Sequence, residues 1–194
     1  VLAINILAFV VAMLLTKGIK GTNAFRTVFF MPNLIGGIVL GYIWQIILNG
    51  VLAHWGRTLT YSSKYGFWGL VILMCWQQIG YMIIYVAGIQ NIPGDLIEAA
   101  KIDGATPSQI LKNVTIPMVM PSITICSFLT LTNSFKLFDQ NLALTAGEPA
   151  NSSELLALNI FNTFYGRNGW EGVGQAKAVV FFVIVAVIAI TQNK

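Results

Sequence analysis

Uncharged polar side chains recur inside the apolar stretches of this sequence, at spacings that place them on shared helix faces. Two stretches carry such residues at positions i, i+3, i+4 and i+7, and a third has an Asn one turn from a Gly. The residues are Thr130, Asn133, Ser134 and Leu137; Gln77, Gly80, Tyr81 and Ile84; and Asn33 with Gly37. Amides and hydroxyls bond the hydroxyls of a neutral polyhydroxylated solute, and aromatic rings stack on its faces. The set therefore predicts a solute lining, with helix packing in a bilayer as the alternative.

Several kinds of reactive site are missing from the sequence. There is no GxxxxGK[ST] motif to cradle nucleotide phosphates, and His54 is the single histidine, which excludes an HExxH zinc site. No pair of Asp or Glu lies at mid-membrane depth, so an intramembrane protease and a carboxylate proton relay are also excluded. The chain is therefore not predicted to be an enzyme. If it moves a solute uphill, the energy must come from another subunit.

Composition places the chain in a lipid bilayer. Its 194 residues are 56% hydrophobic and only 9% charged, whereas soluble domains carry about a quarter charged residues. The net charge of +4 is spread along the chain and gives no support for nucleic-acid binding. Cys75 and Cys126 fall in predicted spans, far from any CxxC spacing, and are interpreted as apolar filler without a disulfide.

Five apolar segments are predicted to cross the membrane, given that a span needs about 20 residues. They are Val1–Thr16, Thr27–Leu48, Gly66–Ile89, Met118–Phe138 and Ala176–Ile190. The second contains Pro32 and the pair Gly36-Gly37, and Pro121 interrupts the fourth. Val1 opens inside an apolar run that is not a signal peptide, so we expect at least one helix to precede this segment. The predicted fold class is all-α, a polytopic transmembrane helical bundle forming one membrane domain over residues 1–194.

The longest polar interruption, residues 91–117, carries ordered helix signals. Pro93 suits the start of a helix, Asp95 and Glu98 suit its positive end, and Gly104 is a natural stop. A second helix is predicted to begin at once, because Thr106 is a good N-cap and Gln109 completes a capping box. The pattern predicts two short helices, joined by a glycine elbow, between two membrane spans.

This stretch resembles the EAA loop of the permease subunits of ABC importers. The family spacing is Glu-Ala-Ala, three residues, Gly, nine residues, Ile, one residue, Leu-Pro; Val114 and Ile116 here replace the Ile and Leu and keep apolar character. In that family the loop is cytoplasmic and docks into a groove on the partner ATPase. The resemblance implies an ATPase-coupling role for Glu98, Ala99, Ala100, Asp103, Gly104 and Pro117.

Two more segments are similar to permeases of the carbohydrate-uptake type. They are FFMPNLIGGIVLGYIWQIILN at residues 29–49, and TAGEPANSS at residues 145–153, which resembles a TxGGPxxST segment. The resemblance implies half of a sugar translocation pathway in the bacterial cytoplasmic membrane, with no cofactor in this chain. The implied partners are a second homologous permease, an ATPase dimer that binds ATP and Mg, an extracellular solute-binding protein and an oligosaccharide substrate.

A cytoplasmic position for residues 91–117 places residues 17–26 and the C-terminus inside as well, and residues 49–65 and 139–175 outside. The basic residues favour this orientation modestly, with six inside against four or five outside. The apolar run 155–164 is expected to re-enter the outer membrane face. Alternatives are an importer for amino acids, phosphate or glycerol phosphate, which would favour Arg or Lys on the lining faces, and a passive channel, which needs no docking loop.

Overall fold

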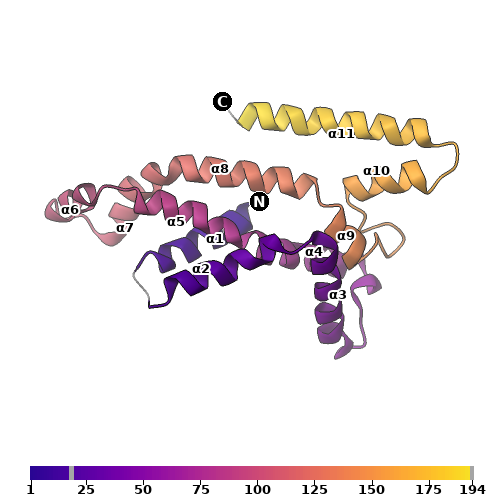
Figure 1. Cartoon of the computed structure of the whole chain (residues 1–194), viewed down its shortest axis with the longest axis horizontal. Helices are drawn as coiled ribbons and strands as arrows, with labels where there is room; N and C mark the ends of the chain where they lie inside the picture. Colours follow the sequence, from indigo (N-terminus) through magenta and orange to yellow (C-terminus); the bar gives the residue numbers. More distant parts are fainter. Residues whose placement is uncertain (18–19, 193–194) are drawn as a thin grey trace. The chain divides into compact units, whose positions relative to one another are not determined.

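The computed structural model describes residues 1–17 and 20–192, and within these ranges it consists of helices joined by turns and loops, without strands (Figure 1). The α-helices are α1 (Leu2–Leu15), α2 (Thr22–Phe30), α3 (Gly37–Ala53), α4 (Ser63–Gln78), α5 (Met82–Gln90), α6 (Gly94–Ile102), α7 (Pro107–Ile110), α8 (Ile116–Phe135), α9 (Asp139–Leu144), α10 (Leu156–Tyr165) and α11 (Glu171–Gln192). Short turns of other helix types are η1 (Met31–Leu34), η2 (Leu59–Tyr61), η3 (Ile79–Tyr81) and η4 (Leu111–Thr115). The all-α prediction is confirmed. Residues 18–19 of the first predicted link and residues 193–194 of the predicted inner C-terminus lie outside the described ranges.

The described residues contain three helices long and apolar enough to cross a membrane: Ser63–Gln90, Pro107–Phe135 and Glu171–Thr191. Three of the five predicted spans meet this measure of length and composition. The first predicted span, α1, is shorter than a bilayer crossing needs. The second is a bent pair of helices, Thr22–Leu34 and Gly37–Ala53, and counts as a fourth crossing only if both are taken together. Its break follows Pro32, which lacks the backbone N–H that a continuing helix requires.

The boundaries of the other predicted spans also shift. The third begins earlier, at Ser63, and contains the 3₁₀ turn Ile79–Tyr81. The last begins at Glu171, before the predicted start at Ala176. Pro121 lies within α8 and does not interrupt it. The sequence signals that mark helix ends are local. Polar residues in the first turns of a membrane span therefore make the start of its helix difficult to predict.

The helices form two compact units. Unit 1 comprises Val1–Pro32 and Gln78–Thr130. Its core lies where α1, α5 and α8 pack, and consists of Ala8, Ala12, Leu15, Met82, Tyr85, Val86, Ile92, Val119 and Cys126. Small residues allow this close packing: a Cβ added to Gly88 on α5 would lie 2.3 Å from Ser122 Oγ on α8. In a bilayer, where burial from water does not drive helix association, such close van der Waals contact holds helices together.

A polar clamp crosses the same core. The Tyr85 hydroxyl donates to Asn5 Oδ1 at 2.7 Å, and Asn5 Nδ2 donates to Thr130 Oγ1 at 3.4 Å. The Thr130 hydroxyl in turn donates to the Cys126 carbonyl at 2.6 Å. Because unpaired polar groups are costly at membrane depth, this chain of bonds ties α1 to both α5 and α8.

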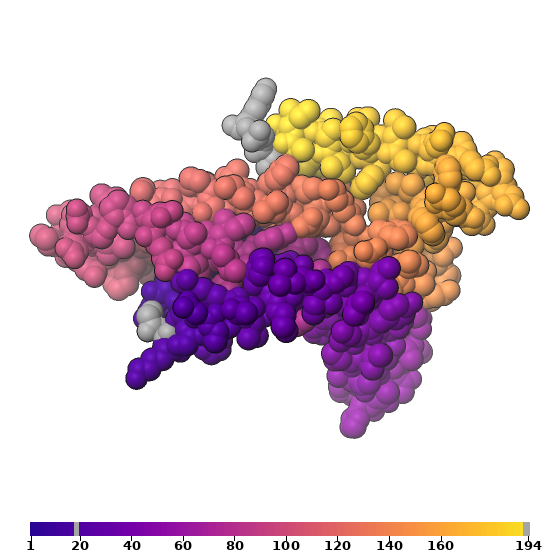
Figure 2. Space-filling view, in the orientation of Figure 1, coloured from indigo at the N-terminus to yellow at the C-terminus, as the bar shows by residue number. Residues whose placement is uncertain are grey.

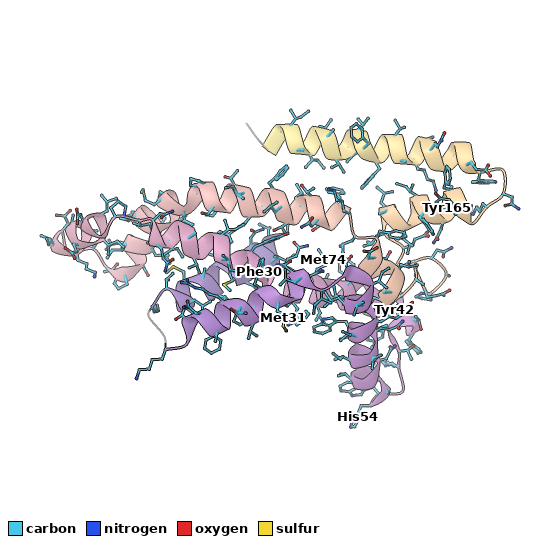
Figure 3. The ribbon with its side chains drawn as sticks, in the orientation of Figure 1. Phe30, Met31, Tyr42, His54, Met74 and Tyr165 are labelled. Carbon is cyan, nitrogen blue, oxygen red and sulfur yellow. The ribbon has the colours of Figure 1, made fainter. Side chains whose placement is uncertain are left out.

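Unit 2 comprises Asn33–Gln77 and Leu131–Lys194, described as far as residue 192. The α3–η2–α4 hairpin encloses an apolar cluster of Leu40, Leu59, Leu70, Leu73 and Leu144, and His54 lies at the hairpin's end (Figure 3). The Trp44 and Trp76 rings meet edge to face with centroids 5.5 Å apart. The short helix α9 lies against α3, and the Gln45 side chain donates to the Leu144 carbonyl at the end of α9, at 3.0 Å.

The buried side chain of Asn141 fixes the segment between α9 and α10. Its Nδ2 donates to the Ser153 carbonyl at 2.9 Å, and its Oδ1 accepts from the Leu155 N–H at 2.8 Å. The Ser153 hydroxyl donates to Thr145 Oγ1 at 3.0 Å, on the same segment. Residues 155–164, which were predicted to re-enter the outer membrane face, correspond to α10. This helix directly follows the Asn141 network in the chain and packs on α11.

Candidate functional site

The first half of the predicted elbow is a helix with a fully bonded end. After α6, Gly104 takes the left-handed conformation with φ of 76°. The Ala105 N–H donates to the Ala100 carbonyl at 2.9 Å, and the Gly104 N–H donates to the Lys101 carbonyl at 3.0 Å. These two bonds make a Schellman motif, which requires glycine's freedom at the left-handed position. The predicted helix stop at Gly104 is confirmed.

The second half begins with the predicted capping box. The Thr106 N–H donates to Gln109 Oε1 at 2.7 Å, and the Gln109 N–H donates to Thr106 Oγ1 at 3.4 Å. Pro107 occupies the first helical position, where its missing N–H costs nothing. Both caps act on the few residues between α6 and α7, so the turn is defined by local sequence.

The sequence predicted a separate short helix for the second half of the elbow. Instead, the second half is the start of the span that includes α8. A π-helical segment, Leu111–Thr115, joins α7 to α8 without a break. In a regular α-helix the ring of Pro117 would clash with the carbonyl of Asn113, four residues earlier. Asn113 lies within the π-helical segment, whose wider turn makes room for the ring. Pro117 therefore shapes the helical connection between the elbow and the span.

The elbow lies at the end of unit 1 where α5 ends and α8 begins, and its outer surface is exposed (Figures 1 and 2). Glu98, Ala99 and Asp103 are exposed and Ala100 is half-buried. Ile97 packs against the core of unit 1, whereas Ile102 is 86% exposed. Ile102 lies one turn from Glu98 on the same helix. The exposed surface of the elbow therefore combines a carboxylate, small residues and an isoleucine.

Among the predicted lining residues, Gly37 and Gln77 meet around Gln140 in unit 2. Gln140 Nε2 donates to Gln77 Oε1 at 3.0 Å. A Cβ on Gly37 would lie 3.0 Å from that Nε2 and 2.8 Å from Asp139 Cβ, so the bare backbone of Gly37 makes room for the amide pair. The amide pair leaves Gln77 Nε2 as a donor and Gln140 Oε1 as an acceptor.

Three other predicted lining residues in unit 2 carry amide or hydroxyl groups near helix ends. Asn33, in η1, is half-buried, and its Nδ2 is buried without a hydrogen-bond partner. On α8, Asn133 is exposed and Ser134 is half-buried. A buried amide donor without a partner is costly, so a ligand that bonds Asn33 would gain from it.

The remaining predicted lining residues differ from the expected pattern. Leu137 lies beyond Phe135, where α8 ends, and is buried, so the predicted helix face does not extend to it. Thr130 is fully buried inside the polar clamp of unit 1. Gly80 and Tyr81 lie in the 3₁₀ turn of unit 1, which departs from the α-helical period that placed them beside Gln77. Unit 2 contains Asn33, Gly37, Gln77, Asn133, Ser134 and Leu137.

Gln140, Gly41 and Gln45 belong to the same region but were not predicted. Gly41 stands four residues after Gly37, and a Cβ there would lie 2.6 Å from Ala143 Cβ. The Gly-x-x-x-Gly spacing in an apolar helix is a known signal for close helix packing, and it marks where α9 rests on α3. The role of Gln140 could not be recognised from the sequence, because its partner Gln77 is 63 residues away.

Within residues 1–17 and 20–192, no cluster of three or more His, Cys, Asp or Glu side chains is placed to hold a metal ion. The polar groups described above are amides, hydroxyls and the exposed carboxylates of Glu98 and Asp103 on the elbow. Their chemistry is recognition by hydrogen bonding, together with docking of the exposed elbow.

Comparison with known proteins places these features in a family context. The family model described as "Binding-protein-dependent transport system inner membrane component" matches residues 4–193. The "probable starch degradation products transport system permease protein AmyD" of Thermoanaerobacterium thermosulfurigenes is 48% identical over 201 residues, covering 99% of this chain and 68% of that protein. The "multiple sugar-binding transport system permease protein MsmF" of Streptococcus mutans is 30% identical, covering 97% of this chain and 68% of that one.

A solved structure shares the fold. It is described as a bacterial ABC transporter involved in the import of the acidic polysaccharide alginate, and it matches with a TM-score of 0.78 and 18% identity. The match covers 96% of this chain and 70% of the other. The long apolar helices and the elbow thus belong to a fold that an importer subunit also has.

Proposed function

Because the chain belongs to the family of binding-protein-dependent transport system inner membrane components, we propose that it forms half of the translocation pathway of a sugar importer in the bacterial cytoplasmic membrane. The solute is a neutral oligosaccharide, and starch degradation products are the first candidates, since a relative 48% identical to the chain carries that description. A partner ATPase hydrolyses ATP with Mg, and this chain needs no cofactor of its own.

The observation that carries the proposal is the exposed elbow between α5 and α8. Its backbone is held by a Schellman motif and a capping box, yet its outer face leaves Glu98, Ala99 and Ile102 without cover from this chain. A rigid knob with small residues and an open isoleucine suits a groove on another protein. Since α7 continues through the π segment into α8, a force on the elbow moves a span directly.

The proposed solute contacts are the uncharged groups of unit 2. Gln77 and Gln140 offer a donor and an acceptor, and Asn33 Nδ2 offers a buried donor that lacks a partner. Asn133 and Ser134 add polar atoms on α8. Hydrogen bonds to sugar hydroxyls satisfy such groups without a charge, which favours a neutral solute over a phosphate or an amino acid.

The remaining partners follow from the family and its binding-protein dependence. A second homologous permease completes the pathway, two ATPase domains engage the two elbows, and an extracellular solute-binding protein delivers the sugar. In support, a related importer structure with a TM-score of 0.77 is described as a complex with an alginate pentasaccharide-bound periplasmic protein.

Replacing Gln77 with Leu is expected to lower sugar uptake roughly tenfold, because it removes hydrogen bonds that together contribute about 1 to 1.5 kcal/mol. The measurement is uptake of labelled maltooligosaccharides by cells that express the full set of partners, at matched membrane levels. Asn168→Leu is the control, since Asn168 is an exposed amide in the turn between α10 and α11.

Equal uptake by Gln77→Leu and wild type would remove Gln77 from the solute path while leaving the importer function intact. Absence of ATP-dependent uptake of any labelled sugar by the wild type would reject the sugar-importer function itself. Flux that continues after ATP depletion would identify a passive channel, and uptake of glycerol phosphate in place of sugar would favour the other solute class.

A further inference from the structure

The helix α10 has two faces of opposite character. Its apolar face carries Ala157, Ile160, Phe161, Phe164 and Tyr165, which repeat at helical spacing. Its polar face carries Asn159, Asn162 and Thr163. With ten residues the helix is too short to cross a bilayer, so an amphipathic helix of this kind lies at the membrane interface.

The polar face of α10 is hydrogen-bonded within unit 2, with Thr163 buried and Asn159 and Asn162 half-buried. Lys177 on α11 donates from Nζ to Asn159 Oδ1 at 2.7 Å and to Thr163 Oγ1 at 2.8 Å. The Glu154 carboxylate accepts from Asn159 Nδ2 at 2.7 Å and from Asn162 Nδ2 at 2.5 Å. Asn159 thus bridges a carboxylate and an ammonium group, and this network attaches α10 to α11 (Figure 1).

The apolar face of α10 is left open and lines a pocket of about 410 Å³ shared with α11 and Phe138. The Phe138 and Phe161 rings lie 5.0 Å apart, and the Phe161 and Tyr165 rings 4.9 Å apart. Tyr165 is 71% exposed and lies near the end of α10 (Figure 3). Gly174 forms the closest approach of the two walls, since a Cβ there would lie 2.8 Å from Phe164 Cβ.

This arrangement differs from what water favours. A hairpin in water would bury its aromatic rings and expose Lys177 and Glu154. Here Phe161 and Tyr165 are exposed, whereas Lys177 and Glu154 are half-buried and hydrogen-bonded, an arrangement that an apolar surrounding medium stabilises. The continuing helix α11 agrees, because only 6% of its apolar window is buried by this chain.

A basic and aromatic group lies in the turn between the two helices that line the pocket. The turn that joins α10 to α11 carries Arg167, whose guanidinium lies 5.0 Å from the Trp170 ring centre. Both residues are exposed, and Tyr165, which lines the pocket, is two positions before Arg167. Trp, Tyr and Arg gather at the headgroup level of a bilayer, with apolar surface below them.

We propose that the α10–α11 hairpin binds an anionic phospholipid, with an acyl chain in the aromatic pocket and the phosphate on Arg167. The pocket is apolar and concave, as an acyl chain requires, and Arg167, two positions after the pocket residue Tyr165, supplies the complementary charge. The site shares no residue with the elbow or with the Gln77–Gln140 pair, and it requires no particular transported solute.

The test uses the complete importer reconstituted in nanodiscs of phosphatidylglycerol that contain a phosphatidylglycerol probe with a diazirine on its acyl chain. After irradiation, mass spectrometry is expected to find saturable labelling in residues 157–178. Arg167→Gln is expected to lower this labelling about fivefold, the effect of one basic residue near an anionic lipid. Ala178→Trp, which fills the pocket, is expected to abolish it.

Arg57→Gln is the matched control, because Arg57 is also an exposed arginine lying over aromatic rings, those of Tyr61 and Tyr65. It is expected to leave labelling of residues 157–178 unchanged. Labelling that does not saturate and is equal in wild type and Arg167→Gln would mean bulk lipid only and would overturn the proposal. A photo-crosslinker at Tyr165 that captures another protein chain instead of lipid would overturn it as well.

Discussion

Gly41→Leu is expected to lower the unfolding temperature of the chain by roughly 6 to 12 °C. A side chain at this position would begin 2.6 Å from Ala143 Cβ and 3.3 Å from the Gln140 carbonyl, both on α9. Overpacking of this kind costs about 1 to 3 kcal/mol, and displacing α9 also breaks the bond from Gln45 to Leu144, worth about 1 kcal/mol. The expected temperature change follows from about 3 kcal/mol in a chain of this size.

The measurement is thermal unfolding of the purified protein in detergent. Gly50→Leu is the control, because Gly50 lies on the same helix and a Cβ there would have nothing within 4 Å. It is expected to change the free energy of unfolding by less than about 0.5 kcal/mol. Equal unfolding temperatures for the two variants would show that α9 does not rest on α3 as described.

Gly104→Val is expected to lower uptake about tenfold without preventing membrane insertion. The φ of Gly104 is 76°, and a β-branched residue there costs about 1 to 2 kcal/mol or more. That energy is enough to move the elbow population about tenfold toward other conformations, in which the Schellman bonds to Ala100 and Lys101 are lost. A reshaped elbow would no longer present Glu98 and Ile102 at the same angle to the span.

The measurement is ATP-dependent uptake at matched membrane levels of each variant. Gly94→Ala is the control, since Gly94 begins α6, its φ is not positive, and an added Cβ meets nothing within 4 Å. It is expected to behave as wild type. If Gly104→Val transports as well as Gly94→Ala, the shape of the elbow is not important for coupling.

The elbow is the part of the structure that sequence predicted best. Its helix ends depend on residues within one turn of each other, such as Thr106 with Gln109 and Gly104 with Ala100. Local bonds of this kind can be recognised from spacing alone. The prediction failed only at the far end, where α7 continues into α8 through a π segment that no simple spacing marks.

The lining was harder to predict, because its members depend on distant partners. Thr130 shares a helix face with Asn133. However, the Thr130 hydroxyl accepts a hydrogen bond from Asn5, which is 125 residues away in the sequence. Gly37 was predicted as lining, yet the close approach of α9 explains why a glycine stands there. Periodicity shows which residues share a face, whereas tertiary contacts decide whether that face packs or meets a ligand.

The elbow is proposed to couple this chain to an ATPase, and Glu98→Arg tests this coupling directly. Glu98 is exposed on α6, so charge reversal there is not expected to prevent folding or insertion. Glu171→Arg, a charge reversal at another exposed acid in a first helical turn, is the control. Labelled oligosaccharide uptake and co-purification of the ATPase are measured for both variants and wild type. Glu98→Arg is expected to lose both while Glu171→Arg keeps both; full uptake with a retained ATPase in Glu98→Arg would contradict the coupling role of the elbow.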